Sequence, residues 1–152
     1  MRRTLTTATA VLVALAGTVA MAQKVTNPME LDAAMKKVAP AMGAANKAIK
    51  SGDYAGAKAS LATVKQALTD AENFWVMHKK DDAIAMSKDS ITKVTALEQA
   101  VSAPTPDMEA VMAAVKVAGG TCGACHKTYR EQDANMQYQL KAGTIQSPSS
   151  GS

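Results

Sequence analysis

The residues with the most distinctive chemistry lie together near the C-terminal end of the sequence. Cys122 and Cys125 are the only cysteines of the 152-residue chain, and His126, one of two histidines, follows directly. On a helix, positions i, i+3 and i+4 share a face, so the three side chains would project together. Two thiols beside an imidazole could form a disulfide, a zinc site, a thiol redox centre or a covalent anchor for haem.

The N-terminus indicates the compartment, which limits what a cysteine pair can be. A basic start, Arg2-Arg3, precedes an uncharged and mostly apolar run over residues 5–19, and Ala20-Met21-Ala22 forms a small-x-small cleavage site. We interpret residues 1–22 as a signal peptide. A membrane span needs about 20 predominantly apolar residues, so an uncleaved anchor is the weaker alternative. The mature protein is expected to be periplasmic and to have no membrane span.

Composition after cleavage restricts the classes of function. Removal of residues 1–22 leaves 130 residues and lowers the formal net charge from +4 to +2, because two arginines and no acid are lost. No cluster of Lys and Arg suits phosphate contacts, which argues against nucleic acid as a partner. The length suits one domain. Only five aromatic residues are available for its core, so another group could fill the middle.

Two segments before residue 81 show the apolar period of helices. Asn27 as N-cap and Pro28 at the first position predict one continuous helix that ends at Ser51-Gly52. Its stripe is Leu31, Met35, Val38, Met42, Ala45 and Ile49. Asp53 can cap a second helix, whose stripe is Ala57, Leu61, Val64, Leu68, Ala71 and Trp75.

Two further helical segments follow. The third starts at Asp81 or Asp82, and Ser87 interrupts its stripe of Ile84, Ile91, Val94, Leu97 and Val101. The fourth has Thr105 as predicted N-cap and Pro106 at its first position, and it continues through the cysteine motif; the apolar pattern fades after about Glu131. No segment alternates with the period of two that a strand requires, and no hairpin signal is seen.

Four amphipathic helices with short connections predict the architecture. Short loops make consecutive helices antiparallel neighbours, so we expect an all-α, up-down-up-down antiparallel four-helix bundle. This domain is assigned to residues 23–142. Residues 143–152 are small and polar with no apolar face, and they are predicted to be a disordered tail.

The alternatives for the cysteine motif differ in what else they require. A thioredoxin-type centre needs a βαβ pattern, which is missing. Zinc needs three or four protein ligands, and His78 is the only further His or Cys. A disulfide between i and i+3 closes a very short loop and adds little stability. Covalent haem, held by thioethers from Cys122 and Cys125 with His126 as axial ligand, fits an exported chain best. The predicted cofactor is therefore haem c, one per chain.

The order of these features resembles a known family. A signal peptide, four amphipathic helices and Cys-x-x-Cys-His-x-x-Tyr-Arg late in the chain are similar to the class II cytochromes c, the cytochrome c′ family. The resemblance covers roughly residues 27–133 by architecture, but only residues 122–130 by specific motif. The tail after Glu131 is longer than the family usually carries, and we assign it no role. Because the family often dimerises through its first two helices, the resemblance also implies a homodimer.

The resemblance implies a role for each residue of the motif. Cys122 and Cys125 would be the thioether anchors, and His126 would be the proximal ligand. Tyr129 and Arg130 match the aromatic residue and the arginine that pack beside the proximal face in the family.

The distal ligand is predicted from heights along the bundle. The first and fourth helices are antiparallel, so the start of one lies beside the end of the other. Met35 and His126 are each about seven residues from those ends, which places them at a similar height at about 1.5 Å per residue. Met42 would lie about 10 Å too far along, and Met29 about 9 Å too early. Low-spin, methionine-ligated family members carry their ligand early in the first helix, followed by a lysine as in Met35-Lys36, which implies the same residue.

Simpler interpretations stay open beside these roles. Eight methionines remain in the mature chain, so Met35 could be an ordinary core residue. Trp75 reaches the predicted level of the haem, although a core role is its default. Arg130 is either a surface charge or the partner of a haem propionate. His78, between Met77 and two lysines, is expected to be solvated.

The sixth coordination position separates two functions. The sequence contains no nucleophile motif, phosphate loop or suitably placed carboxylate pair, so we predict that the protein is not an enzyme. Methionine ligation raises the potential and favours a one-electron carrier between periplasmic redox proteins. An open distal position would favour a five-coordinate binder of nitric oxide or carbon monoxide instead, as in cytochromes c′ proper.

Overall fold

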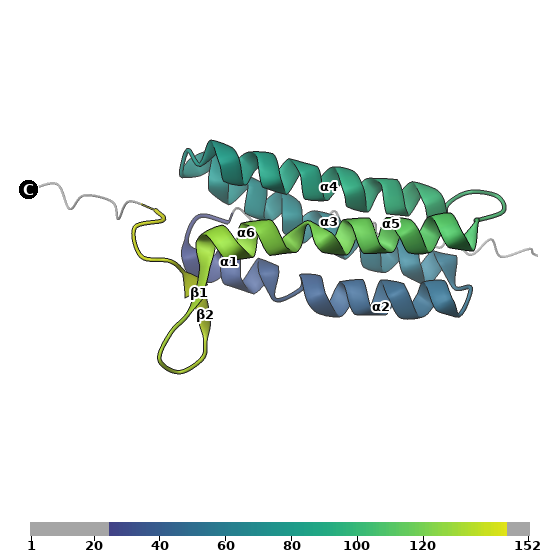
Figure 1. Cartoon of the computed structure of the whole chain (residues 1–152), viewed down its shortest axis with the longest axis horizontal. Coiled ribbons are helices and arrows are strands. Elements are labelled where there is room, and N and C mark those ends of the chain that lie inside the picture. Colours follow the sequence, from purple (N-terminus) through teal and green to yellow (C-terminus); the bar gives the residue numbers. More distant parts are fainter. Residues whose placement is uncertain (1–24, 146–152) are drawn as a thin grey trace, which may run out of the picture.

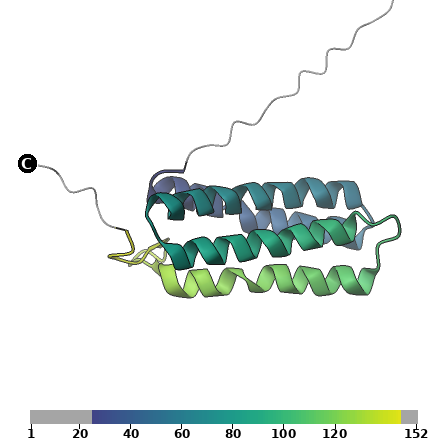
Figure 2. The same ribbon diagram turned by 90° about the horizontal axis from the view of Figure 1, so that it is seen from above.

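The chain forms four rods of helix that run alternately up and down (Figure 1, Figure 2). The computed structural model describes residues 25–145, so the predicted signal peptide lies outside the described residues. The helices of this part are α1 (Pro28–Met35), α2 (Val38–Lys50), α3 (Tyr54–Met77), α4 (Asp81–Val101), α5 (Met108–Gly120) and α6 (Cys122–Tyr129). α1 with α2 forms the first rod, and α5 with α6 the fourth. The predicted all-α four-helix bundle is confirmed.

Side-chain caps begin the first two rods as expected. Asn27 accepts a hydrogen bond from the amide of Glu30 at 3.0 Å, and Pro28 occupies the first turn of α1. The Glu30 carboxylate reaches one residue further back than a capping box requires, and it accepts from the amide of Thr26 at 2.6 Å. Asp53 caps α3 by accepting from the amide of Gly56 at 2.9 Å.

The first rod is broken, which corrects the predicted continuous helix. α1 ends at Met35 and α2 begins at Val38, with Lys36 and Lys37 between them. Pro40 explains the break. It has no amide hydrogen to donate to the carbonyl of Lys36, and its ring would clash with that carbonyl in a continuous helix.

The fourth rod begins two residues later than predicted. Asp107, and not Thr105, is the N-cap of α5, and its carboxylate accepts from the amide of Glu109 at 3.0 Å. A carboxylate suits this position because it also interacts favourably with the positive end of the helix dipole. Pro106 consequently lies before the helix and not in its first turn.

A short β-hairpin follows α6, which corrects the prediction that no hairpin is present. β1 (Arg130–Gln132) pairs antiparallel with β2 (Tyr138–Leu140), and Arg130 lies opposite Leu140. The carboxylate of Asp133 stabilises the turn by accepting from the amides of Asn135 and Gln137, both at 2.8 Å. The hairpin extends from the end of α6 beside α1 (Figure 1).

Two clusters of buried apolar residues hold the bundle together. The first cluster contains residues of α2, α3, α4 and α5, including Ile49, Leu61 and Leu97, which are fully buried. The second cluster lies nearer the hairpin and consists of Val25, Leu31, Ala34, Ala71, Phe74, Trp75, Ala83 and Tyr129. Met35 is partly buried and packs against both clusters.

The start of the predicted polar tail packs onto the domain, which corrects its boundary. Thr144 is only 8% exposed, and Ile145 packs against the second cluster. The packed domain therefore reaches residue 145 and does not stop at residue 142. The remainder of that tail, residues 146–152, lies outside the described residues.

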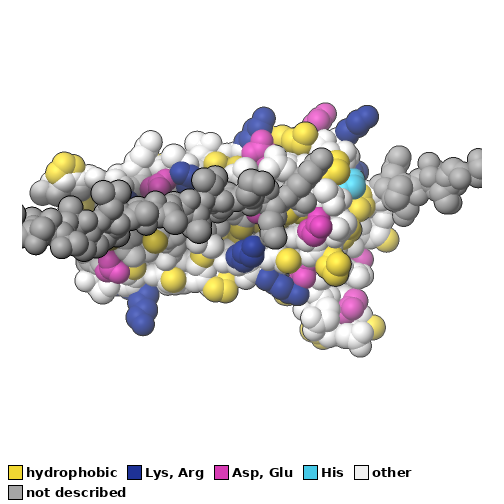
Figure 3. Space-filling model, turned by 180° about the vertical axis from the view of Figure 1, so that it is seen from behind, with side chains coloured by type: hydrophobic (Ala, Val, Ile, Leu, Met, Phe, Trp, Pro, Cys, Tyr) yellow, Lys and Arg dark blue, Asp and Glu magenta, His cyan; other side chains and the backbone are white. Residues whose placement is uncertain are grey.

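The surface of the described part carries charges of both signs. On the face seen in Figure 3, basic and acidic side chains are interspersed wherever grey atoms do not cover them. Large apolar side chains such as Met29, Val76 and Met136 are also exposed. Among residues 25–145, no helix combines the length and the apolar character that crossing a bilayer would require.

Candidate functional site

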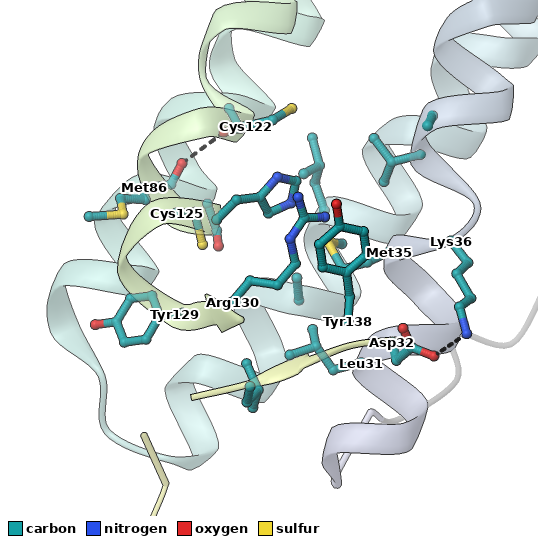
Figure 4. Close-up of a pocket in the computed structure, with 18 of the residues that line it drawn as sticks. Leu31, Asp32, Met35, Lys36, Met86, Cys122, Cys125, Tyr129, Arg130 and Tyr138 are labelled. Carbon is teal, nitrogen blue, oxygen red and sulfur yellow. Dashed lines mark hydrogen bonds and ion pairs between the residues drawn. The ribbon is translucent and has the colours of Figure 1, made fainter. Parts of the chain in front are cut away.

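A cavity of about 970 Å³ is lined by residues from all four rods and from the hairpin. Its volume falls within the range of about 300–1,000 Å³ that is typical of cofactor sites. All seven residues singled out from the sequence line this one cavity: Cys122, Cys125, His126, Tyr129, Arg130, Met35 and Trp75. In Figure 4 the cysteines and Arg130 approach it from one side and Met35 from the other. Their individual roles stay predictions.

Small residues create the space inside the bundle. Ser87 and Ser90 of α4 are both buried, at 6% exposed, and line the cavity beside Ala71 of α3. Gly43 of α2 and Gly119 of α5 line it as well, and a Cβ atom on either glycine would meet nothing within 4 Å. Larger side chains at these five positions would fill the middle of the bundle. The lining therefore suits a large, flat, mostly apolar group such as haem.

The cysteine motif occupies its own short helix. Thr121 separates α5 from α6, and its hydroxyl donates to the carbonyl of Ala118 at 2.8 Å. Cys122, Cys125 and His126 share the face of α6 that borders the cavity, and both thiols are free. Within residues 25–145, no group of three His, Cys, Asp or Glu side chains could hold a metal ion. The donor set therefore does not fit a zinc site, whereas two free thiols beside a histidine fit covalent haem.

Burial controls the protonation of the motif. It raises the pKa of the Cys125 thiol, and the nearby sulfur of Cys122 acts in the same direction. It lowers the pKa of His126, and the positive charge of Arg130 lowers it further. At neutral pH the imidazole is therefore uncharged and keeps a lone pair for a metal. A protonated Cys125 does not suit thiolate redox chemistry.

Met35 reaches the cavity from the first rod. It is the last residue of α1, directly before the break, and it is partly buried. Met29 and Met42 also line the cavity, so proximity alone does not distinguish the three methionines. Met29 is 78% exposed at the start of α1, which makes it the least suited of them to a buried metal bond.

Tyr129 connects α6 to the rest of the bundle. Its ring lies against that of Trp75, with 4.9 Å between the centroids, and its hydroxyl donates to the Asp82 carboxylate at 2.6 Å. Burial and the hydrogen bond to Asp82 raise the pKa of Tyr129 to about 12. The same hydrogen bond lowers the pKa of Asp82. Sequence reasoning missed Asp82, because a helix-start acid gives no sign of a partner 47 residues away.

Replacing Tyr129 with Phe should change how stability depends on pH. An unfolded tyrosine loses its proton near pH 10, whereas folded Tyr129 keeps its proton up to a pH of about 12. Between these values the unfolded chain binds fewer protons, so the stability conferred by this group falls as pH rises. When the free energy of unfolding is measured with urea from pH 8 to 12, it should therefore fall with a slope that corresponds to up to about one proton. The Tyr129→Phe variant should lack this contribution to the slope. Asp82→Asn should weaken the slope, and an unchanged slope in Tyr129→Phe would contradict this explanation.

Arg130 and Tyr138 meet at the edge of the cavity. The guanidinium carbon of Arg130 lies 3.9 Å from the centroid of the Tyr138 ring, and both side chains line the cavity (Figure 4). None of the ion pairs in residues 25–145 includes Arg130. This cation is therefore available for an anionic ligand group. Sequence reasoning missed Tyr138, because its role depends on the hairpin.

His78 differs from the expected solvated side chain and lies away from the cavity. Its ring packs against Phe74, with 4.4 Å between the centroids, and Nε2 is buried without a hydrogen-bond partner among the described residues. His78 does not line the cavity, so it is not a ligand candidate there.

A comparison with models of known protein families matches part of the chain. The family model described as Cytochrome C' matches residues 69–130, which extend from α3 to the first residue of β1 and include the complete cysteine motif. No curated protein and no solved structure matches the chain. Over these residues the chain is similar to the cytochrome c′ family, whose members carry one covalently attached haem c per chain.

Proposed function

We propose that the protein is a periplasmic carrier of single electrons, with His126 as proximal and Met35 as distal haem ligand. The observation that carries this proposal is that Met35, from the first rod, and His126, from the fourth, line the same cavity. Bound haem c supplies a reversible iron(III)/iron(II) couple. The protein has to hold that group, set its potential and keep its surroundings unchanged between the two oxidation states.

The motif residues attach and orient the group. Cys122 and Cys125 are one helical turn apart on α6 and would form the two thioethers. Because His126 is held uncharged, it can donate its lone pair without first releasing a proton. Met35 would contribute a neutral thioether, a ligand that raises the potential. Two neutral protein ligands would keep the iron six-coordinate in both oxidation states, so little reorganisation would accompany electron transfer.

The remaining lining residues exclude water and balance charge. Trp75 and Tyr129 belong to the buried second cluster and would pack against the macrocycle. Arg130, at the edge of the cavity beside Tyr138, would pair with a haem propionate. A charge-assisted hydrogen bond of this kind is worth about 1.5–3 kcal/mol. The apolar surroundings lower the local dielectric and tune the potential.

The cellular location follows from the proposed leader. Cytochrome c′ family proteins are typically periplasmic, and residues 1–22 would direct export and be removed. The redox partners would then be other periplasmic proteins. Mass spectrometry of the mature protein should identify Gln23 as its first residue.

An optical spectrum of the purified holoprotein tests the proposed ligation. With methionine bound, the oxidised protein should be low-spin and show the weak far-red band of a sulfur–iron(III) contact. The reduced protein should bind carbon monoxide slowly, because the gas must displace Met35. A high-spin oxidised spectrum with rapid binding of carbon monoxide would overturn the proposal and favour the gas-binding function.

A further inference from the structure

We propose that the C-terminal hairpin braces α1 against the haem-binding helix, and that Leu140 is the positioning residue that keeps Met35 at the iron. This inference rests on the proposed methionine ligation. It assigns a role to a segment beyond the matched family region, which ends at Arg130. The hairpin is thus a feature of this chain that the family match does not account for.

The helix that carries Met35 depends on contacts from other elements. α1 has only eight residues, and the break at Lys36 and Lys37 separates it from α2. Isolated helices shorter than about 12–15 residues are marginal in water. The position of α1 is therefore set by what it packs against, and Met35, as its last residue, moves with it.

Two elements hold α1 in place. Leu31 and Ala34 are buried in the second cluster, where they meet α3 through Phe74 and Trp75. β2 also contacts α1. Leu140 of β2 is partly buried, packs against the second cluster and lines the cavity together with Met35. The hairpin therefore extends the apolar surface that holds α1.

The other end of the hairpin is attached to the helix that carries His126. β1 follows α6 directly, and the amide of Lys141 donates to the carbonyl of Tyr129 at 2.9 Å. The ammonium of Lys141 donates to the carbonyl of Lys127 at 2.7 Å. Both bonds lie at the end of β2, next to Leu140. The hairpin is thus fixed to α6 and touches α1, so it connects the helices of the two proposed ligands.

This connection predicts an effect on ligation that differs from a general loss of stability. When Leu140 is shortened, α1 gains freedom relative to α6, and the population with Met35 away from the iron increases. Truncation of an apolar residue elsewhere lowers stability but leaves that population unchanged. The far-red band and the binding of carbon monoxide report the population directly.

The experiment compares the holoproteins of the wild type, Leu140→Ala, Leu140→Ile and Ile91→Ala. Ile91 is the matched control, because it is also partly buried, but it packs against the first cluster and does not line the cavity. Leu140→Ala should weaken the far-red band and accelerate binding of carbon monoxide by roughly tenfold. Leu140→Ile, which keeps the volume and adds no sulfur, should retain the wild-type band. Ile91→Ala should lower the thermal midpoint and leave band and binding rate unchanged.

Each result separates this inference from the proposed function. If Leu140→Ala keeps the wild-type far-red band and the wild-type rate of carbon monoxide binding, the proposed role of the hairpin is wrong, whereas Met35 can still be the ligand. Equal changes in Ile91→Ala would show general loosening and also overturn it. A wild type without the band would overturn the ligation and the brace together. If Leu140→Ala does not fold, Leu140→Val removes only one methylene and should show the same changes to a smaller degree.

Discussion

Replacing both Cys122 and Cys125 with Ala should abolish covalent attachment of haem. The wild-type mature protein should weigh one haem more than its polypeptide, and the haem should survive acid–acetone extraction, because thioether bonds are not broken by acid. The double variant should have the mass of the bare chain. Cys125→Ser should leave a product with one thioether or without haem.

A control within the motif distinguishes thioether chemistry from damage to α6. Ala124 lies between the two cysteines and is exposed, so Ala124→Ser should retain the full haem mass. Expression must take place in cells that assemble c-type cytochromes. Under that condition, a wild-type mass equal to the bare chain would rule out covalent haem.

Loss of haem should also loosen the fold. The group would fill much of a cavity of about 970 Å³, and interiors of stable proteins are packed nearly as densely as organic crystals. Two aromatic residues of the second cluster, Trp75 and Tyr129, line that cavity and would lose their packing partner. The cysteine-free protein should therefore show a weaker near-ultraviolet circular dichroism signal than the holoprotein, with much of its helical signal retained.

The sequence predicted the helices well because each has a long apolar stripe. Such a stripe must face a core, and the short connections leave few arrangements other than an antiparallel bundle. The cysteine motif was equally visible, since its three residues are neighbours in sequence. The break in the first rod was missed because it depends on a single residue. Pro40 breaks the first rod within an apolar stripe that continues across the break.

Ser87 shows how an apparent irregularity can mark the site. The predicted stripe of α4 was interrupted there, yet Ser87 and Ser90 are both buried and face the cavity. A small residue at a core position leaves space that a cofactor can occupy. The hairpin was missed for a different reason. Its strands have three residues each, too few for a period of two to be recognised, and their position depends on contacts with α1 and α6.

Met35→Ala should convert the protein from a closed to an open haem site. Removal of the thioether should abolish the far-red band and give a high-spin or water-ligated iron. The midpoint potential should fall by on the order of 0.1 V, within the range of about 0.8 V that axial ligands span. Carbon monoxide should bind much faster to the reduced variant, since no protein ligand has to leave. Optical spectra, a redox titration and stopped-flow mixing measure these three changes.

The other methionines of the cavity provide matched controls for this result. Met42 belongs to α2, beyond the break that follows Met35, and Met29 is largely exposed. Both line the same cavity as Met35, so Met42→Ala and Met29→Ala remove the same atoms from its wall. If Met35 is the ligand, as proposed, neither variant should change the spin state, because neither methionine would bind the iron. If Met42→Ala abolished the band and Met35→Ala did not, the break after Met35 would have moved the ligand to α2, and the height argument would be wrong.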